Sequence, residues 1–338
     1  SVGKKSLWWT VYMFDKFRLT PAKYQRITYL SILLLSLIIV TGAAVRLTGS
    51  GLGCSDWPTC EDDQLVAEID DVHAMVEFVN RVITGIVSLA VILAVLGSLF
   101  REPRRKDLTW WSLGLVFGVI LQIIVGALVV REHLPPSLVI AHFLISMVLV
   151  WNAVELHHRA KFSVNTLPQP SRASLRSLSS LLVLLASGVL VTGTLVTGSG
   201  PHSGAETTQT KEALEGLEEG AIQLNAESFE VERLPFDVPD VARIHAITMI
   251  VFLIVMAYTV LQISKLAKTK HVFPRAQNLL TVAVLQGAIG YTQYFTDVPA
   301  LLVGFHIGGA VAVWIMTLRL NLAFRLPIED DKKLLASK

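Results

Sequence analysis

The sequence predicts an all-α polytopic membrane protein in which eight transmembrane helices form two tandem four-helix bundles, related by a pseudo-twofold axis along the membrane normal. Three observations predict this fold class: eight apolar runs of about 20 residues, an alternation of Lys and Arg between successive loops, and an internal repeat. The chain has 338 residues, 52% of them hydrophobic and 17% charged, which is typical of membrane proteins rather than soluble ones. The net charge of +2 gives no indication of a nucleic-acid partner.

The apolar runs are the predicted membrane spans, because each is long enough to cross the hydrocarbon core of a lipid bilayer as a helix. In chain order they cover residues 28–46, 72–99, 109–130, 137–158, 175–197, 240–264, 276–296 and 299–323.

These spans divide the chain into two predicted bundles with short cytoplasmic connections. We expect an N-terminal bundle over 28–158 and a C-terminal bundle over 175–323. A cytoplasmic segment at 1–27, a linker at 159–174 and a tail at 324–338 account for the remaining residues.

Lys and Arg concentrate in alternate loops and at both ends of the chain, whereas the intervening loops are poor in both residues. Two of the poor loops are acidic, at 54–71 and 206–240. The positive-inside rule then places both termini in the cytoplasm and these loops outside a cell membrane. We expect the external loop 198–240 to contain a short surface helix at 211–219, which suits either a docking surface or a solvated insertion.

The repeat is clearest in two segments separated by a constant offset of 164 residues, "LQIIVGALVVREHLPPSLVIAH" at 121–142 and "LQGAIGYTQYFTDVPALLVGFH" at 285–306. The matched pairs include Gln122 with Gln286, Gly126 with Gly290, Pro135 with Pro299, Leu138 with Leu302, and His142 with His306. Each half has an even number of spans, so both halves cross the membrane in the same sense, as in parallel repeats. Four-helix bundles build cofactor sites from side chains on facing helices.

Three histidines lie inside predicted spans at one depth. His142, His245 and His306 each lie five to seven residues inside the external end of a span, roughly 8–10 Å below the outer surface. Any one of them alone could be a structural residue, but three at one level favour metal ligation. His245 and His306 suit axial heme ligation. The remaining histidines considered lie at helix ends or in loops and are interpreted as solvated or interfacial: His133, His157, His158, His202 and His271.

The N-terminal half lacks an obvious second ligand. When the two halves are aligned by the repeat, His245 corresponds to Arg81 or Asn80. Asn is a poor ligand for heme iron. Ionisable and polar groups at membrane depth are costly and usually functional. The polar residues on one helical stripe of this span are His73, Glu77, Asn80 and Thr84.

The sequence resembles the heme A synthase family over residues 28–320. The motifs that carry the resemblance are "TGAAVRLTGSGLGCSDWPTC" at 41–60, the E-F-x-N-R element at 77–81, "HLPPSLVIAH" at 133–142, "VTGSGPHSG" at 196–204, a His on the sixth span and "FHIGG" at 305–309.

The resemblance implies an oxidoreductase that converts heme O to heme A by oxidising a ring methyl to a formyl, with a bound heme b. It implies that His245 and His306 ligate heme b, that His142 faces the iron of the substrate heme, and that Glu77 is the catalytic acidic residue. Many family members have His where this sequence has Asn80, so bis-His ligation of the substrate heme is not expected. An open or weakly held axial position suits a heme that must enter and leave; His73 is an alternative ligand.

Glu77 and the two cysteines each have a structural alternative. Glu77 and Arg81 are spaced to form an i, i+4 ion pair. Cys54 and Cys60 are the only cysteines and lie in an external, oxidising loop. We expect a disulfide that stabilises the loop by about 2 kcal/mol, either as a structural staple or as a redox pair near the substrate site.

Three arginines lie at external helix ends, namely Arg46, Arg131 and Arg243. They suit the heme propionates as partners, although snorkelling to the interface would place them equally well. We expect heme O as substrate, the lipid bilayer as surroundings and a heme O synthase as partner, whereas the electron acceptor and the oligomeric state are undetermined. The competing interpretations are an electron-transfer cytochrome b and a transporter without heme; Glu77 and the incomplete ligand pair favour the enzyme.

Overall fold

The computed structural model describes residues 18–54, 59–60, 66–67, 70–161, 173–203, 233–265 and 272–324. Within these residues the fold is all-α, apart from one isolated bridge between Leu19 and Arg101. The helices are α2 (Pro21–Leu47), α3 (Val72–Phe100), α4 (Lys106–Arg131), α5 (Pro136–Ala160), α6 (Ala173–Ser199), α9 (Val238–Ser264), α10 (Phe273–Phe295) and α11 (Ala300–Ala323). The surface helix expected at 211–219 lies outside the described residues.

Local capping sets the helix beginnings. Helix α2 begins well before the apolar run that predicts it, because Thr20 accepts a hydrogen bond from the Lys23 amide at 3.3 Å and Pro21 occupies the first turn. Asp71 caps α3 by accepting from the Ala74 amide at 2.9 Å. The sequence pattern therefore locates the helices, and polar residues outside the apolar runs fix their ends.

The chain is a multi-pass membrane protein, since seven of its described helices are long and apolar enough to span a bilayer. Large apolar side chains such as Trp110, Phe117 and Leu184 remain exposed on these helices, as contact with lipid tails requires. The predicted span 276–296 corresponds to α10, which falls short of the required apolarity because it includes Gln277, Asn278 and Gln286.

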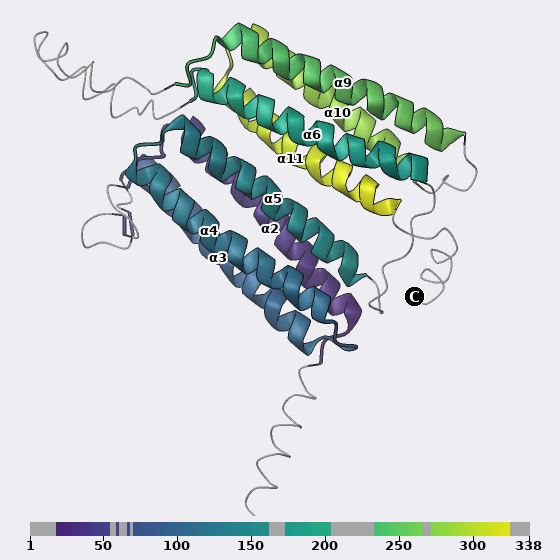
Figure 1. Ribbon diagram of the computed structural model, residues 1–338. Helices are drawn as coiled ribbons and strands as arrows, with labels where there is room; N and C mark the ends of the chain where they lie inside the picture. The colour runs from purple at the N-terminus through teal and green to yellow at the C-terminus, as the bar shows by residue number, and fades with distance from the viewer. Residues whose placement is uncertain are drawn as a thin grey trace, which may run out of the picture.

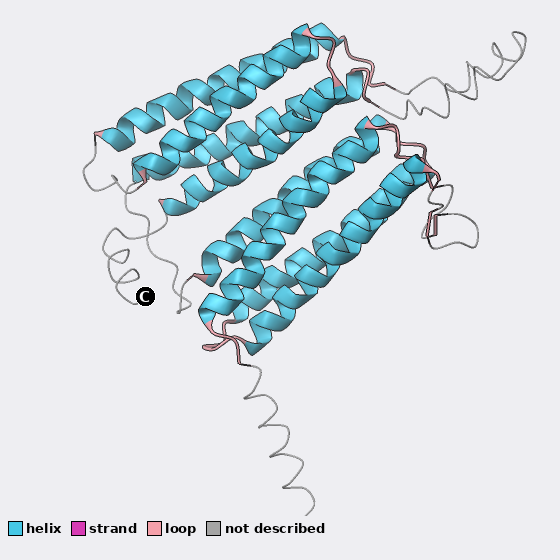
Figure 2. Cartoon of the chain, turned by 180° about the vertical axis from the view of Figure 1, so that it is seen from behind, coloured by secondary structure: helices cyan, strands magenta, loops and turns pink. Residues whose placement is uncertain are grey.

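The helices pack in two groups of four, visible as two separate layers in Figures 1 and 2. We call α2–α5 the N-terminal bundle and α6, α9, α10 and α11 the C-terminal bundle. In each bundle consecutive helices are neighbours and the last packs against the first, so the helices form a closed ring. Helices α3 and α5 are therefore diagonal partners in one bundle, and α9 and α11 in the other.

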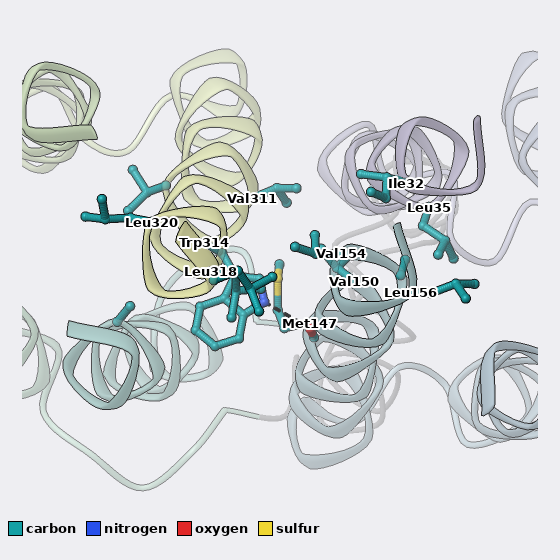
Figure 3. Packing of buried hydrophobic residues seen from close by; sticks show 14 of the residues in the cluster. Ile32, Leu35, Met147, Val150, Val154, Leu156, Val311, Trp314, Leu318 and Leu320 are labelled. Carbon is teal, nitrogen blue, oxygen red and sulfur yellow. Dashed lines mark hydrogen bonds between the residues drawn. The ribbon is translucent and has the colours of Figure 1, made fainter. Parts of the chain in front are cut away.

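The two bundles meet where α11 packs against α2 and α5, and α5 against α6. The indole Nε1 of Trp314 on α11 donates to the Met147 carbonyl on α5 at 3.0 Å, within the buried cluster of Figure 3. A methyl group added at Gly304 of α11 would lie 3.8 Å from Leu47 of α2.

The α4–α5 and α10–α11 turns have the same backbone conformation. Four residues other than glycine adopt a positive φ between 53° and 59° in them: His133, Leu134, Asp297 and Val298. The Leu134 amide donates to the Val129 carbonyl and the Val298 amide to the Gln293 carbonyl, both at 2.8 Å. The paired residues differ in number by the repeat offset. Helices α5 and α11 therefore begin in the same way. Each helix begins six residues before its histidine, His142 or His306.

Candidate functional site

His245 on α9 and His306 on α11 face one another across the C-terminal bundle. Their ring centroids lie 6.4 Å apart with an interplanar angle of 74°. A metal–nitrogen bond is about 2 Å long, so one ion bonded to both imidazoles would separate the two ring centroids by roughly 6 Å. The pair therefore fits bis-His coordination, and axial ligation by histidine is a common way to hold heme iron. The described residues contain no cluster of three or more His, Cys, Asp or Glu placed to hold a metal ion.

The neighbouring helix α6 contacts His245 through a Thr-Gly pair. Thr192 Oγ1 lies 3.1 Å from His245 Nδ1 and 2.9 Å from the Gly188 carbonyl. A methyl group at Gly193 would lie 3.0 Å from Cε1 of the His245 ring, so the absence of a side chain at Gly193 is what admits the imidazole.

The neighbouring helix α10 contacts His306 through Gln286 and Gly290. Gln286 Nε2 donates to the backbone carbonyl of His306 at 2.6 Å. A methyl group at Gly290 would lie 3.0 Å from Cε1 of the ring. His306 Nδ1 is buried and has no hydrogen-bond partner among the described residues.

His142 on α5 has the same kind of surroundings as His306. Gln122 Nε2 on α4 donates to the His142 carbonyl at 3.0 Å, and a methyl group at Gly126 would lie 3.3 Å from Cε1 of the ring. His142 Nδ1, too, lacks a partner within the described part of the chain.

Asn80 on α3 has the surroundings of His245. The Thr41 hydroxyl on α2 donates to Asn80 Oδ1 at 2.9 Å, and a methyl group at Gly42 would lie 4.0 Å from Asn80 Nδ2. The local contacts therefore align Asn80, rather than Arg81, with His245. The N-terminal bundle thus presents one imidazole and one amide where the C-terminal bundle presents two imidazoles.

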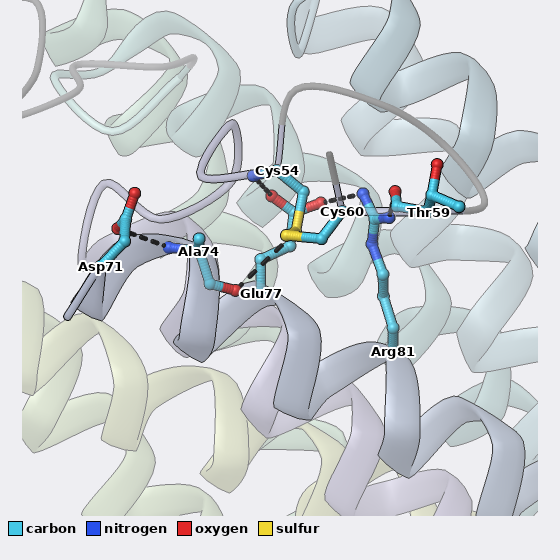
Figure 4. Close-up of a disulfide and its surroundings, with 7 residues drawn as sticks. All are labelled: Cys54, Thr59, Cys60, Asp71, Ala74, Glu77 and Arg81. Atoms are coloured by element: carbon cyan, nitrogen blue, oxygen red, sulfur yellow. Dashed lines mark hydrogen bonds and ion pairs between the residues drawn. A yellow bond between two sulfur atoms is a disulfide. The ribbon is translucent and has the colours of Figure 1, made fainter. Parts of the chain in front are cut away.

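Glu77 lies beneath the loop between α2 and α3, three residues before Asn80, and contacts residue Cys54 of that loop (Figure 4). Its Oε1 accepts from Arg81 Nη2 at 2.6 Å, and its Oε2 accepts from the Cys54 amide at 3.0 Å. Arg81 also donates through Nη1 to the Thr59 carbonyl at 2.7 Å. The expected ion pair is present, and its two residues bond to the loop at Cys54 and at Thr59, next to the two cysteines.

Cys54 and Cys60 form a disulfide. Both are buried, beside Ala74 on the first turn of α3, and Cys54 Sγ lies 3.7 Å from the Ala74 carbonyl. His73, at the same end of α3, is half-buried, and its Nδ1 lies 3.0 Å from Ser50 Oγ. That contact holds His73 in the first turn of α3, almost two turns before Asn80.

The three arginines have different surroundings. Arg46 Nη1 donates to the His202 carbonyl at 2.6 Å and so connects α2 to the residues that follow α6. Arg131 is exposed in the last turn of α4. Arg243 is exposed and lies 3.2 Å from Asp240.

The interpretation of the peripheral histidines as solvated or interfacial is wrong for His158, which is only 9% exposed. His157 is half-buried, and its Nδ1 lies 3.0 Å from Thr28 Oγ1 on α2. His202 Nε2 lies 2.9 Å from the Val298 carbonyl. This contact connects the residues after α6 to the turn between α10 and α11. His133 is exposed, as expected, and His271 lies outside the described residues. The basic neighbours in the sequence do not reveal that His158 is buried and His157 half-buried.

The sequence interpretation missed Thr41 and Thr192, which contact the candidate positions on α3 and α9. One signal could have identified them: each is followed by glycine, a few residues before the T-G-S-G motif that ends its span.

Proteins of known families resemble this chain in sequence. The COX15-CtaA family model, described as a cytochrome oxidase assembly protein, matches residues 25–318. A protein of Exiguobacterium sibiricum named heme A synthase is 31% identical over 113 residues, which are 33% of this chain and 38% of that protein. Heme A synthases of Listeria welshimeri and Lysinibacillus sphaericus are 33% and 29% identical over 35% and 33% of this chain. The matched stretches span 39% and 36% of those two relatives.

Proposed function

The chain belongs to the COX15-CtaA family of cytochrome oxidase assembly proteins, and from this premise we propose that it is a heme A synthase, which oxidises a ring methyl of heme O to the formyl of heme A with a bound heme b. The observation that carries the proposal is the contrast between the two bundles. One presents two imidazoles 6.4 Å apart, and the other presents His142 with Asn80. A permanently held cofactor suits the first arrangement, and a heme that must be exchanged suits the second.

The proposed membrane arrangement has eight spans. Helix α10 has 23 residues, a length of roughly 35 Å, which suffices for the hydrocarbon core. It also packs between α9 and α11 in the ring, so we include it as the eighth span. An even number of spans puts both termini on one side of the cell membrane, and the Lys- and Arg-rich loops on that side support its being the cytoplasmic side. Four spans in each half support a pseudo-twofold axis along the membrane normal. The site then lies toward the external face.

In the C-terminal bundle, His245 and His306 would hold heme b. When bound, this heme supplies one-electron redox chemistry at a potential that its axial ligands and their neighbours set. Arg243 near the external end of α9 is available to pair with a propionate, as is Arg46 at the end of α2.

In the N-terminal bundle, His142 would contact the iron of heme O. Asn80 cannot ligate that iron firmly, and instead offers an amide that hydrogen-bonds at the open face. Arg131, at the external end of α4, suits a propionate of the substrate. These roles leave the substrate site with one strong ligand, consistent with substrate entry and product release.

Glu77 would handle protons or stabilise positive charge that develops at the carbon being oxidised. Arg81 and the Cys54 amide hold its two oxygens in place, so the ion pair is compatible with a catalytic role. Pre-positioned charge of this kind needs no rearrangement during the reaction.

An electron-transfer cytochrome b is the second candidate, because the His245–His306 pair alone would suffice for it. The two functions differ in their pigments. Heme b together with heme O or heme A in the purified protein supports the synthase, whereas two hemes b per chain support the electron carrier.

The decisive experiment replaces Glu77 by Gln, which keeps the size of the side chain and removes its charge. In cells that supply heme O, the variant should still insert and bind heme b, but should accumulate heme O or a partly oxidised heme in place of heme A. Glu132→Gln, the same change at an exposed external position, is the control. Heme A at the wild-type level from Glu77→Gln would end the catalytic assignment and leave Glu77 as the structural partner of Arg81.

The product is insoluble in water, as is the substrate, so transfer between proteins inside the membrane is the simplest supply route. We therefore propose a heme O synthase as the partner that delivers the substrate.

A further inference from the structure

Each candidate ligand position in the structure is contacted by a hydrogen-bonding side chain and a glycine from a neighbouring helix. We propose that Thr192, Gly193, Gln286 and Gly290 are positioning residues that fix how His245 and His306 present their Nε2 atoms to a heme iron. This inference rests on the proposed function, because it takes the two histidines as ligands of heme b.

Thr192 favours one tautomer of His245. A threonine hydroxyl has one hydrogen to donate and two lone pairs. The carbonyls of Gly188 and Val189, 2.9 Å and 3.2 Å away, can only accept, so they are acceptors for the hydroxyl hydrogen. With the hydrogen on a carbonyl, the Thr192 oxygen accepts from His245 Nδ1, 3.1 Å away, and this arrangement favours the proton on Nδ1. A neutral imidazole with hydrogen on Nδ1 has its lone pair on Nε2, which is the form that binds metal.

The glycines determine where the rings lie. A methyl group at Gly193 or Gly290 would lie 3.0 Å from the Cε1 atom of the respective histidine, closer than carbon atoms pack. Two other glycines on the same helices differ. A methyl group at Gly188 would meet Thr248 at an ordinary 3.5 Å, and one at Gly287 would meet nothing within 4 Å. Gly198 of α6 is also crowded, since a methyl group there would lie 2.9 Å from Leu234, but no histidine ring crowds it.

Gln286 holds the backbone that carries His306. Its Nε2 donates to the carbonyl of that residue, in addition to any bond the carbonyl accepts within α11. The Gln286 side chain is buried and lies against Gly309, where a methyl group would overlap its amide oxygen. Through these two contacts Gln286 restricts the sliding of α11 along its axis near His306.

The N-terminal bundle provides independent support. Gln122 and Gly126 contact His142 as Gln286 and Gly290 contact His306. Thr41 and Gly42 also lie beside Asn80, but here the threonine donates and a methyl group at the glycine would lie at an ordinary contact distance of 4.0 Å. The side chain at position 80 is an amide, yet its neighbours are the same types. A Thr-Gly pair therefore lies beside this position in both bundles, whether the residue there is an imidazole or an amide.

The first test measures the midpoint potential and the electron paramagnetic resonance spectrum of heme b in the purified full-length protein. Thr192→Val keeps the shape and removes the acceptor for the Nδ1 proton. Because a hydrogen bond at Nδ1 increases the basicity of a ligating imidazole, its loss should raise the heme b potential and shift the low-spin signal. Thr192→Ser should restore both. Thr194→Val, which removes a hydroxyl bonded only to the Val191 carbonyl among the described residues, should change neither.

The second test compares Gly290→Ala with Gly287→Ala. The first should displace the His306 ring and alter or convert the low-spin signal, whereas the second should leave it unchanged. A wild-type protein without low-spin heme b would refute the proposed function. A wild-type protein with low-spin heme b, whose signal and potential are the same in Thr192→Val and Gly290→Ala, would refute the positioning role alone.

Discussion

The Glu77–Arg81 pair permits a quantitative prediction, because the structure shows which groups lose partners when one side is removed. Replacing Arg81 by Met keeps an apolar stem of similar length and removes the guanidinium. The Glu77 side chain is 6% exposed and that of Arg81 is 19% exposed. After the change, the Glu77 carboxylate would keep the Cys54 amide as a donor but would lose its charged partner.

Removing one partner from a buried ion pair costs about 3–5 kcal/mol, because the remaining charge is left uncompensated. The lower value applies here, since the carboxylate retains one backbone donor. We therefore expect Arg81→Met to destabilise the folded protein by about 3 kcal/mol. Glu77→Gln should cost less, because Arg81 is partly exposed and water can solvate its guanidinium. The double variant should cost roughly 2 kcal/mol less than the sum of the single changes, as expected for directly contacting residues.

Thermal unfolding in detergent, followed by tryptophan fluorescence, would measure these differences. With an unfolding entropy of about 2 cal/mol/K per residue over 338 residues, a loss of about 3 kcal/mol should lower Tm by roughly 4 °C. Arg18→Met is the control, since Arg18 and Glu102 form an ion pair of 2.8 Å with side chains 55% and 53% exposed, and such pairs contribute little. A Tm of Arg81→Met within 1 °C of wild type, or strictly additive single changes, would refute the reasoning.

Three further predictions follow from the site. Replacing either His245 or His306 by Ala should abolish or convert the low-spin heme b signal while the protein still inserts; an unchanged spectrum in both variants would contradict the assignment. Mass spectrometry of protein never exposed to reductant should find Cys54 and Cys60 bonded to each other, and two free thiols would contradict the disulfide. Asn80→His should add a second axial ligand and shift bound substrate heme toward low spin, and a spectrum unaffected by this change would place position 80 outside the ligand sphere.

The helices could be predicted from the sequence because burial in lipid demands about 20 apolar residues in succession. Their ends depend on single residues such as Thr20 and Asp71, which satisfy the free amides of the first turn. Helix α10 is the difficult case. Its glutamines lower its apolarity, yet one of them, Gln286, is buried and bonded to α11. Apolarity alone therefore underestimates a helix whose polar groups face its own bundle.

The depth of the candidate ligands could also be predicted, because depth along a helix is proportional to residue number. Neighbours on other helices could not, because they depend on how each helix is rotated about its axis. The sequence therefore indicated His245 and His306 but not Thr192, and it indicated the Glu77–Arg81 pair but not the Cys54 amide that completes it. The same limitation explains His158, whose basic neighbours suggested solvent although the side chain is buried.

If the proposed function holds, Asn80 would give the two bundles different roles. The Thr-Gly pair beside it matches the pair beside His245, so the position retains surroundings that suit a ligand. An amide there makes the contact with the threonine hydroxyl but offers no strong donor atom to iron. A heme held by His142 alone would dissociate more readily than one held by two imidazoles, since one coordinate bond fewer must break. A substrate has to leave and a cofactor has to stay, so the loss of a ligand in one bundle and its retention in the other are the expected signs of this division of roles.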